Sequence, residues 1–201
     1  LELRLNFPIQ DNAGNLKFKD FPFLDENKKD GLFDLVNAID YASTDDNIKG
    51  ITIEPKFLNA GITQTKTLRE ALIRFKESGK FVTAYADIYT QLDYYLSSVA
   101  DTIYINPVGD LDFRGLATEL LYMKDIQEKT GVKMDVIRLG KYKSAVEPFL
   151  DSEMSEANRE QISSYLNSIW SNLRKEIGES RNLDMEHLDE IANDLLARTP
   201  E

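Results

Sequence analysis

The sequence predicts an α/β protein with a mostly parallel sheet, crossover helices and further helices towards the C-terminal end. The run Ile48–Glu54 is short, apolar and β-branched, and it ends at Pro55, which is typical of a strand. The run Phe81–Ala86 is apolar on both faces, as expected for a central strand of a parallel sheet. Strand-like and helix-like segments alternate through the middle of the chain, and this pattern indicates right-handed crossovers between parallel strands.

In the first half of the chain, periodicity and end signals define the expected elements. Alternating polar and apolar residues predict strands, and apolar residues three or four positions apart predict helices. Thr67 and Glu70 form the pattern of a capping box, so a helix is expected to begin near Thr67, and Gly79 suits the position after its end. The other expected elements, in order, are a strand over Leu1–Phe7, a helix over about Leu32–Ser43, the two strands named above and a helix over Thr90–Val99.

The second half is predicted to be richer in helices. A strand over Asp101–Ile105 is expected to stop at Asn106-Pro107, and an extended segment and a helix over Glu119–Lys129 follow. Met134–Leu139 is strand-like. Ser155 is expected to cap a long helix that ends at Gly178, and Asp184 to open the last helix. No linker or repeat is visible, so residues 1–201 are expected to form one domain, with the helices in 155–196 available for packing against another domain or copy.

The composition excludes several classes of function. The chain has 24 basic and 35 acidic residues and a formal net charge of −11, which is a poor basis for binding nucleic acid. It has no cysteine and one histidine, His187, which excludes thiolate and multi-histidine metal sites, and we expect neither a metal nor a cofactor. The P-loop, G-x-G-x-x-G, H-E-x-x-H and G-x-S-x-G motifs are absent. The chain begins at Leu1 and is interpreted as a piece of a longer protein.

The strongest chemical signal is the segment from Gly140 to Phe149, which follows the strand-like run Met134–Leu139. Lysine acts as a base only when it is neutral, which requires removal from water or nearby positive charge. Lys143 is followed by small and apolar residues that could exclude water, and Tyr142 or Ser144 could orient its amine. The alternative from spacing alone is a solvated loop lysine, which is the commoner case.

The same segment, G-K-Y-K-S-A-V-E-P-F, resembles the lysine-bearing motif of the signal peptide peptidase A family, also called protease IV. The resemblance extends in order through Leu32–Ile39, Asp46–Ile51, Phe75–Val82 and Gly115–Thr118, and it corresponds to the first half of the long, two-repeat form. It implies a ClpP/crotonase-like fold in which Lys143 is the general base and the serine nucleophile comes from a second repeat. Tyr142 and Ser144 would then support the lysine.

Within this half, the resemblance places the nucleophile position at Gln91, where an active repeat has serine, so this chain lacks the nucleophile. The neighbouring hydroxyl of Thr90 is expected to cap a helix instead. Gly61 lies where an active repeat carries its oxyanion loop, but Ile62 replaces the second glycine, so the loop is interpreted as degenerate. Glu147 is expected to have a structural use.

The resemblance therefore implies half of a Ser/Lys serine peptidase that degrades cleaved signal peptides and other apolar peptides. Its expected partners are those peptides, the second repeat and other copies in a homo-oligomer, a tetramer by family resemblance. The implied location is the bacterial inner membrane, with the domain facing the periplasm and an anchor outside this chain. Two alternatives remain: a non-catalytic scaffold or oligomerisation domain of the same fold, and, more distantly, a crotonase-like acyl-CoA enzyme, for which Asn59-Ala60-Gly61-Ile62 is a poor oxyanion loop.

Overall fold

The structure is a computed structural model that describes residues 1–12, 31–132, 134–135 and 144–199. The chain divides into two compact units. The first comprises residues 1–114 and 175–201, and the second comprises residues 115–174. The expectation of a single domain over residues 1–201 stays a prediction.

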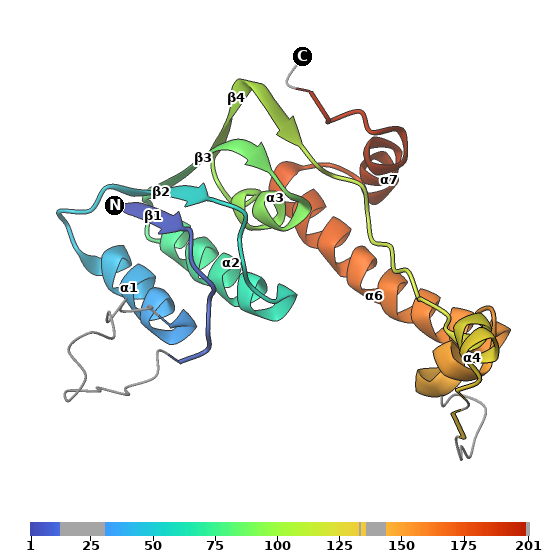
Figure 1. Cartoon of the computed structure of the whole chain (residues 1–201). Helices are drawn as coiled ribbons and strands as arrows, with labels where there is room; N and C mark the ends of the chain where they lie inside the picture. Colours follow the sequence, from blue (N-terminus) through green and yellow to red (C-terminus); the bar gives the residue numbers. More distant parts are fainter. Residues whose placement is uncertain (13–30, 133, 136–143, 200–201) are drawn as a thin grey trace, which may run out of the picture. The chain divides into compact units, whose positions relative to one another are not determined.

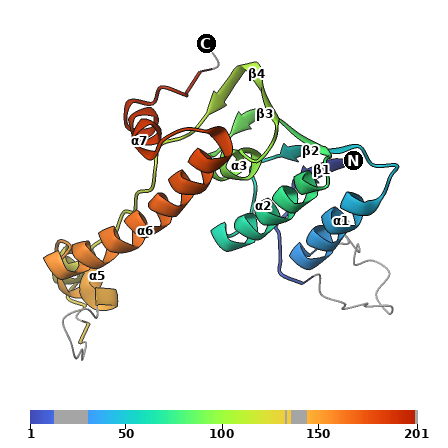
Figure 2. The ribbon, with the colours of Figure 1, turned by 180° about the vertical axis from the view of Figure 1, so that it is seen from behind.

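The first unit is built on a four-stranded parallel sheet with the strand order β1-β2-β3-β4. Successive strands therefore lie side by side, and right-handed crossovers place the connecting helices on one face of the sheet. Figures 1 and 2 show α1, α2 and α3 on that face. The α/β architecture with a parallel sheet is thus confirmed, as the ClpP/crotonase-like prediction requires. The elements are β1 (Glu2–Leu5), α1 (Leu32–Thr44), β2 (Gly50–Pro55), α2 (Ile62–Glu77), β3 (Phe81–Tyr89), α3 (Gln91–Ser97) and β4 (Thr102–Leu111).

The core of this unit lies between the sheet and its helices. Alternate residues of β2 and β3 point inward and meet the apolar face of α2, where Leu68, Leu72 and Phe75 are fully buried. On the opposite face of the sheet, the ring of Phe81 lies over Gly50, where an added Cβ would come within 2.4 Å of that ring. Glycine at the start of β2 therefore permits the close pairing of these two strands.

The expected stop of the fourth strand at Asn106-Pro107 is wrong, because β4 continues to Leu111. Ile105 pairs with Ala86 and Asp110 with Ile88, so the residues between Ile105 and Asp110 form an irregularity and the strand then resumes its pairing. A proline in such a bulge removes no ladder hydrogen bond. Gly109 is required there, because a Cβ would lie 2.1 Å from a backbone oxygen of β3.

The expected start of the second helix near Thr67 is also wrong, because α2 begins at Ile62. The side chain of Gln64 accepts a hydrogen bond from the backbone N–H of Gly61 at 2.8 Å. This is the capping interaction that was expected of Glu70 and Thr67, further along the chain. Thr67 lies inside the helix and donates its hydroxyl to the Thr63 carbonyl. At the other end, Gly79 follows the helix with φ = +83°, as predicted.

The long helix α6 (Glu156–Arg181) begins in the second unit and ends in the first, where α7 (Met185–Asp194) follows it. The predicted end at Gly178 is wrong, because Asn182 takes the left-handed position, with φ = +54°. Gly178 instead allows close approach of the following turn, since a Cβ there would lie 2.5 Å from the Leu183 oxygen. Asp184 caps α7 as predicted, by accepting the backbone N–H of His187.

A buried arginine holds the end of α6 to the rest of the first unit. Arg69 of α2 is 1% exposed, and its guanidinium donates to the Tyr95 carbonyl, the Glu176 carbonyl and the Ser180 hydroxyl. The Glu176 carboxylate accepts from the Tyr95 hydroxyl and pairs with Lys66. Buried charge is tolerated when it is paired and hydrogen-bonded, and the Arg69 Nε also lies 3.7 Å from the Glu176 carboxylate.

The second unit contains α4 (Lys124–Thr130), the short 3₁₀ turn η1 (Ser144–Val146), α5 (Glu147–Leu150) and the first part of α6. The predicted helix over Glu119–Lys129 starts later than expected, because the N–H of Met123 donates to the Pro148 carbonyl at 2.7 Å. Gly131 ends α4 in the left-handed conformation. Most of the predicted strand Met134–Leu139 lies outside the described residues.

Candidate active site

The predicted general base, Lys143, and its neighbour Tyr142 lie outside the described residues. Ser144, the next residue in the chain, is described; it is the first residue of η1 and is partly exposed. The structure therefore bears on the predicted site through the elements that flank this segment in the sequence. These elements are α4 on one side and η1, α5 and α6 on the other.

A buried carboxylate fixes the chain just after the lysine. Glu147 is 1% exposed, and it accepts hydrogen bonds from the Ser155 hydroxyl at 2.6 Å and from the Asn158 amide at 2.9 Å. The Ser155 backbone N–H donates to it as well, at 3.3 Å. Ser155 in turn caps α6 by accepting the N–H of Asn158, which confirms the predicted cap. The structural use expected for Glu147 is confirmed, since its carboxylate ties α5 to the start of α6.

Both flanks of the lysine segment are hydrogen-bonded to one side chain for which the sequence predicted no role. The Gln127 side chain of α4 accepts the N–H of Met134 at 3.0 Å and donates to the Phe149 carbonyl at 2.7 Å. Met134 precedes Lys143 in the chain and Phe149 follows it. A glutamine amide carries both a donor and an acceptor, so it can bridge two backbone strands in this way. No sequence signal pointed to this role.

The predicted nucleophile position, Gln91, is the first residue of α3 and directly follows β3. Its side-chain oxygen accepts the backbone N–H of Arg114 at 3.2 Å. Thr90 is the N-cap of α3, and its hydroxyl accepts the Asp93 N–H at 3.2 Å, which confirms that it is a capping residue. Both side chains thus make local hydrogen bonds, which gives the position a structural use.

Asp93 is a residue of this junction for which the sequence predicted no role. Its carboxylate is fully buried, and it accepts hydrogen bonds from the Leu58 N–H at 2.8 Å, the Thr90 N–H at 3.0 Å and the Thr90 hydroxyl at 2.7 Å. Three donors thus converge on an internal carboxylate. Its signal in the sequence was the spacing Thr90-x-x-Asp93, which is a capping box with aspartate at the third helical position.

Gly61, the predicted remnant of an oxyanion loop, is the N-cap of α2. Its φ of −70° and ψ of 156° are ordinary extended values that other residues adopt. Its N–H donates to Gln64, and the Leu58 N–H of the same loop donates to Asp93. Two backbone donors of this loop therefore already have acceptors within the chain.

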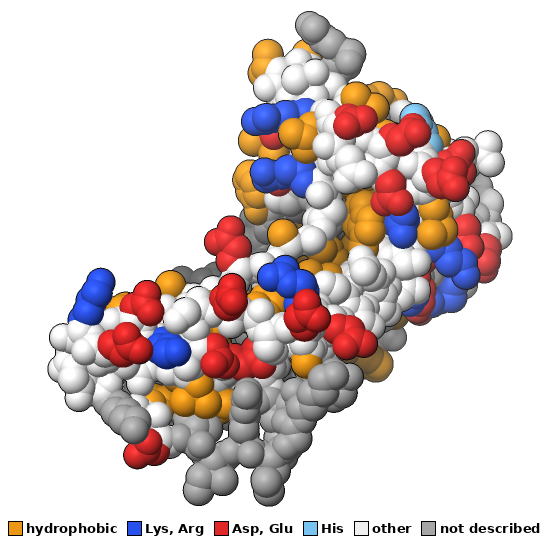
Figure 3. All heavy atoms as spheres, turned by 90° about the vertical axis from the view of Figure 1, so that its right-hand side faces the viewer, with side chains coloured by type: hydrophobic (Ala, Val, Ile, Leu, Met, Phe, Trp, Pro, Cys, Tyr) orange, Lys and Arg blue, Asp and Glu red, His pale blue; other side chains and the backbone are white. Residues whose placement is uncertain are grey.

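Other candidate groups occupy ordinary surface environments. Asp45 accepts from the backbone and side chain of Asn47 in a turn, and His187 is half exposed beside Glu190. Within the described ranges, no cluster of three or more His, Cys, Asp or Glu side chains could hold a metal ion. Acidic side chains are spread over the face shown in Figure 3, in keeping with the formal net charge of −11.

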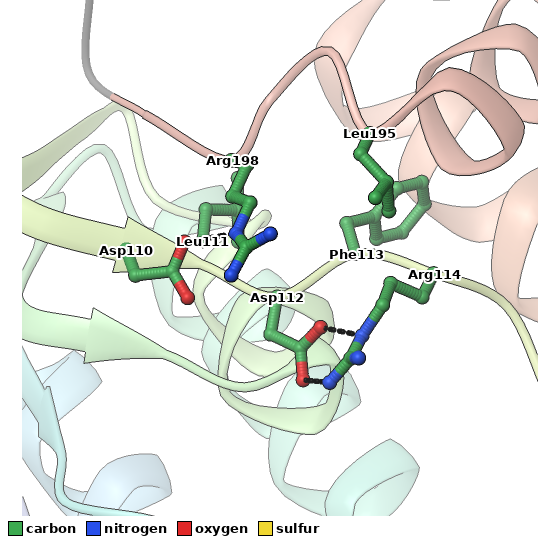
Figure 4. Close-up of a pocket in the computed structure, with 7 residues that line it drawn as sticks. All are labelled: Asp110, Leu111, Asp112, Phe113, Arg114, Leu195 and Arg198. Atoms are coloured by element: carbon green, nitrogen blue, oxygen red, sulfur yellow. Dashed lines mark hydrogen bonds and ion pairs between the residues drawn. The ribbon is translucent and has the colours of Figure 1, made fainter.

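The first unit carries a small pocket of about 60 Å³ between the end of β4 and the chain after α7, shown in Figure 4. Arg114 forms an ion pair with Asp112, and the Arg198 guanidinium lies 3.9 Å from Asp110. Each arginine of the pocket therefore lies beside an aspartate. The pocket holds none of the predicted site residues, although the Arg114 N–H reaches Gln91.

The geometry is that of a parallel α/β scaffold followed by a helical unit whose hydrogen bonds bracket one lysine-bearing segment. The sequence profile of Peptidase family S49 matches residues 74–198, and the chain belongs to that family. The predicted resemblance to signal peptide peptidase A is confirmed at the level of the family.

Curated relatives carry peptidase names. The chain is 38% identical over 171 residues to "Protease 4" of Haemophilus influenzae and 39% identical over 165 residues to "Protease 4" of Salmonella typhi. It is 28% identical over 152 residues to "Serine protease SPPA, chloroplastic" of Arabidopsis thaliana. The aligned parts cover 85%, 82% and 76% of this chain but 28%, 27% and 22% of the relatives, so the chain spans under a third of their length.

Among solved structures, an enoyl-CoA hydratase from Geobacillus kaustophilus aligns with 99% of this chain and 85% of its own, at 13% identity and a TM-score of 0.38. An enoyl-CoA hydratase from Mycobacterium avium aligns with 81% of this chain and 79% of its own, at 13% identity and a TM-score of 0.35. Among the described helices of this chain, none is both long and apolar enough to span a membrane.

Proposed function

We propose that this chain is the lysine-bearing part of a serine peptidase of the Ser/Lys type. Lys143 is the general base, Tyr142 and Ser144 support its amine, and the serine nucleophile lies in a second repeat outside residues 1–201. Membership of Peptidase family S49 supports the peptidase class. We place the base and the nucleophile in different repeats because Gln91, and not serine, stands at the nucleophile position of this chain. The Gln91 side chain is hydrogen-bonded to Arg114.

In the proposed reaction, the serine oxygen attacks the carbonyl carbon of the peptide bond as its proton passes to the neutral amine of Lys143. The protonated lysine then gives that proton to the leaving amine, and an acyl-enzyme remains. Lys143 next takes a proton from a water molecule that attacks the acyl-enzyme, and it returns the proton to the serine oxygen as the acid leaves. No metal or cofactor enters the proposed reaction.

The proposed substrates are cleaved signal peptides and other apolar peptides. The proposed partners are the second repeat and further copies in a homo-oligomer, with a tetramer as the expected size. The proposed location is the bacterial inner membrane, with the domain facing the periplasm and an anchor outside this chain. The bacterial relatives named "Protease 4" support the peptidase class, and the substrates, partners and location follow from the family resemblance.

Replacement of the lysine in the full-length protein tests the assignment. We expect Lys143→Met to lower kcat by about 10²–10⁴-fold on an apolar peptide, because general base catalysis contributes that much. The matched control is Lys129→Met in the last turn of α4, which is expected to leave kcat unchanged. Unchanged activity of Lys143→Met would sink the base assignment and favour the scaffold alternative.

The division of the site has its own test. A fluorophosphonate probe labels an activated serine, so it is expected to label the full-length protein at a serine outside residues 1–201. We expect the purified 201 residues to fold without peptidase activity and without labelling. Hydrolysis by this chain alone, abolished by the probe, would show that the nucleophile lies within it.

A further inference from the structure

The last turns of α6 lie beside α3 in the first unit, and charged and polar contacts hold them there (Figures 1 and 2). Ile177 is the only large apolar residue of the segment Lys175–Arg181, and it is fully buried. The Arg69 guanidinium of α2 donates to the Glu176 carbonyl at 2.5 Å and to the Ser180 hydroxyl at 2.6 Å. The position of this segment therefore depends strongly on electrostatic contacts.

Glu176 brings negative charge to the buried guanidinium of Arg69. Its carboxylate lies 3.7 Å from the Arg69 Nε, accepts the Tyr95 hydroxyl at 2.5 Å and pairs with Lys66. Arg69 is 1% exposed, whereas the side chain of Glu176 is 21% exposed and can exchange a proton with water. Arginine keeps its charge in acid, while a carboxylate takes up a proton. Acid therefore removes one charge of this pair and leaves the other buried.

The helices packed against Glu176 carry further charged and titratable groups. These groups are Lys66, Arg69 and Glu70 of α2, Tyr94 and Tyr95 of α3, and Glu179 in the next turn of α6. Glu70 and Glu179 are exposed, so water screens their charges, and neither compensates Arg69 as Glu176 does. Burial raises the pKa of both tyrosines, which stay neutral in acid. Glu176 is therefore the group whose titration changes the balance of charge at Arg69.

We propose that Lys66, Arg69, Tyr95 and Glu176 form an acid-sensitive latch: when Glu176 takes up a proton, the segment Lys175–Arg181 detaches from α2 and α3 while the sheet of the first unit stays folded. A buried arginine that loses its counter-charge is costly. Detachment of the segment lets water reach the guanidinium and relieves this cost. None of the four latch residues takes part in the proposed peptidase reaction, so the latch stands or falls independently of that reaction.

The direction of the response to pH follows from the contacts of the carboxylate. Burial alone would raise the pKa of Glu176, but hydrogen bonds from Lys66 and Tyr95 outweigh it and hold this pKa below its usual 4.5. The latch is therefore closed at neutral pH and opens as the pH falls through the lowered pKa. A local opening of this kind exposes the amides of one segment to hydrogen exchange while the rest of the fold stays protected.

Backbone hydrogen exchange of the full-length protein at pH 7 and about pH 3.5, corrected for the intrinsic exchange rate at each pH, tests the latch. We expect the protection of amides in 175–181 to fall by about tenfold or more in acid, because the buried pair is broken. Val82 and Ala84 in β3 are the internal control and are expected to keep their protection. An equal loss in β3 would indicate unfolding of the whole unit and would overturn the latch, as would unchanged protection in both segments.

Substitutions separate the effect of charge from other effects of acid. Glu176→Gln, with a neutral side chain in place of the carboxylate, is expected to lower the protection of 175–181 by about tenfold or more already at pH 7. Adding Arg69→Met removes the buried charge and leaves an apolar chain, so we expect protection to return and to stay the same at both pH values. Glu70→Gln, at an exposed position near Lys66, is the matched control and is expected to behave as the unaltered protein.

Two results with these variants would contradict the latch. One is exchange in the double variant that is as fast as in Glu176→Gln, because the charge of Arg69 would then not be the cause of opening. The other is full protection of Glu176→Gln at pH 7. If the double variant does not fold, as judged by circular dichroism, the comparison of the two pH values on the unaltered protein still decides the question.

Discussion

The buried carboxylate of Asp93 accepts the backbone N–H of Leu58 at 2.8 Å, and this bond ties the first turn of α3 to the loop that follows β2. The second oxygen of the same carboxylate accepts the N–H and the hydroxyl of Thr90. The carboxylate thus lies where two loops at the ends of parallel strands meet, a common place for ligands in α/β folds. Here the chain fills that position with its own side chain.

We expect Asp93→Asn to lower the free energy of unfolding by about 1–3 kcal/mol, because the new amide nitrogen must face an N–H donor and leave it unsatisfied. Urea unfolding of the 201-residue chain measures the change. Asp46→Asn, at an exposed position in a turn, is the control and is expected to stay within about 0.5 kcal/mol. Equal stability of the two variants would contradict the role assigned to Asp93.

The alternation of strands and helices was predictable because burial on one or both faces leaves a periodic trace in the sequence. Gly79, Thr90, Ser155 and Asp184 were also predictable, since each acts on backbone groups a few residues away. The continuation of β4 beyond Pro107 was not predictable from the sequence, because a bulge depends on pairing with the neighbouring strand, β3.

The supporting residues of the candidate site illustrate the same limit. Gln127 bonds residues on both sides of the lysine segment, and Asp93 bonds the Leu58 loop 35 positions away in the chain. Such long-range partners leave no local pattern. The lysine motif itself was found through resemblance, since the spacing around Lys143 is equally compatible with a solvated loop.

A second prediction concerns acid stability. Burial works against the ionised form of Glu176, but hydrogen bonds from Lys66 and Tyr95 outweigh it and hold the pKa of this carboxyl below its usual 4.5. A carboxyl whose pKa is lower in the folded than in the unfolded state stabilises the fold at pH values above its unfolded-state pKa. This stabilisation is lost as the pH falls through the folded-state pKa. We expect the free energy of unfolding to fall below about pH 4.5.

Glu176→Gln is expected to make that fall shallower, because the variant has no carboxyl to protonate at this position. Urea unfolding between neutral pH and about pH 3 measures the slope. Glu70→Gln is the control, since Glu70 also lies near Lys66 but is 54% exposed. A slope that responds equally to both changes would contradict the role of the Glu176 site.

A third prediction concerns the anchor behind the lysine segment. The Glu147 carboxylate accepts hydrogen bonds from Ser155 and Asn158 on both of its oxygens, so Glu147→Gln places an amide donor against another donor. We expect a loss of about 1–3 kcal/mol in unfolding free energy. In the full-length protein, kcat is expected to fall as well, because the turn after Lys143 loses its fixed position. Glu153→Gln, an exposed neighbour, serves as the control, and an equal effect of both changes would count against the anchor.

The last prediction is that a serine at the position of Gln91 does not restore peptidase activity to this chain. Gln91→Ser supplies a hydroxyl at the first position of α3, but catalysis also requires donors for the oxyanion that develops on the substrate carbonyl. The Leu58 N–H is engaged by Asp93 and the Gly61 N–H by Gln64. We therefore expect no hydrolysis of an apolar peptide and no labelling by a fluorophosphonate, with the full-length protein as the positive control.

The double change Gln91→Ser with Asp93→Gly frees the Leu58 N–H but leaves Gly61 bonded to Gln64, and it too is expected to be inactive. Adding Gln64→Ala to the double change releases the second donor. Labelling that appears only in this triple variant would show that occupied donors kept the position silent. Labelling of Gln91→Ser alone would contradict the prediction, because it would mean that a serine here is activated despite both hydrogen bonds.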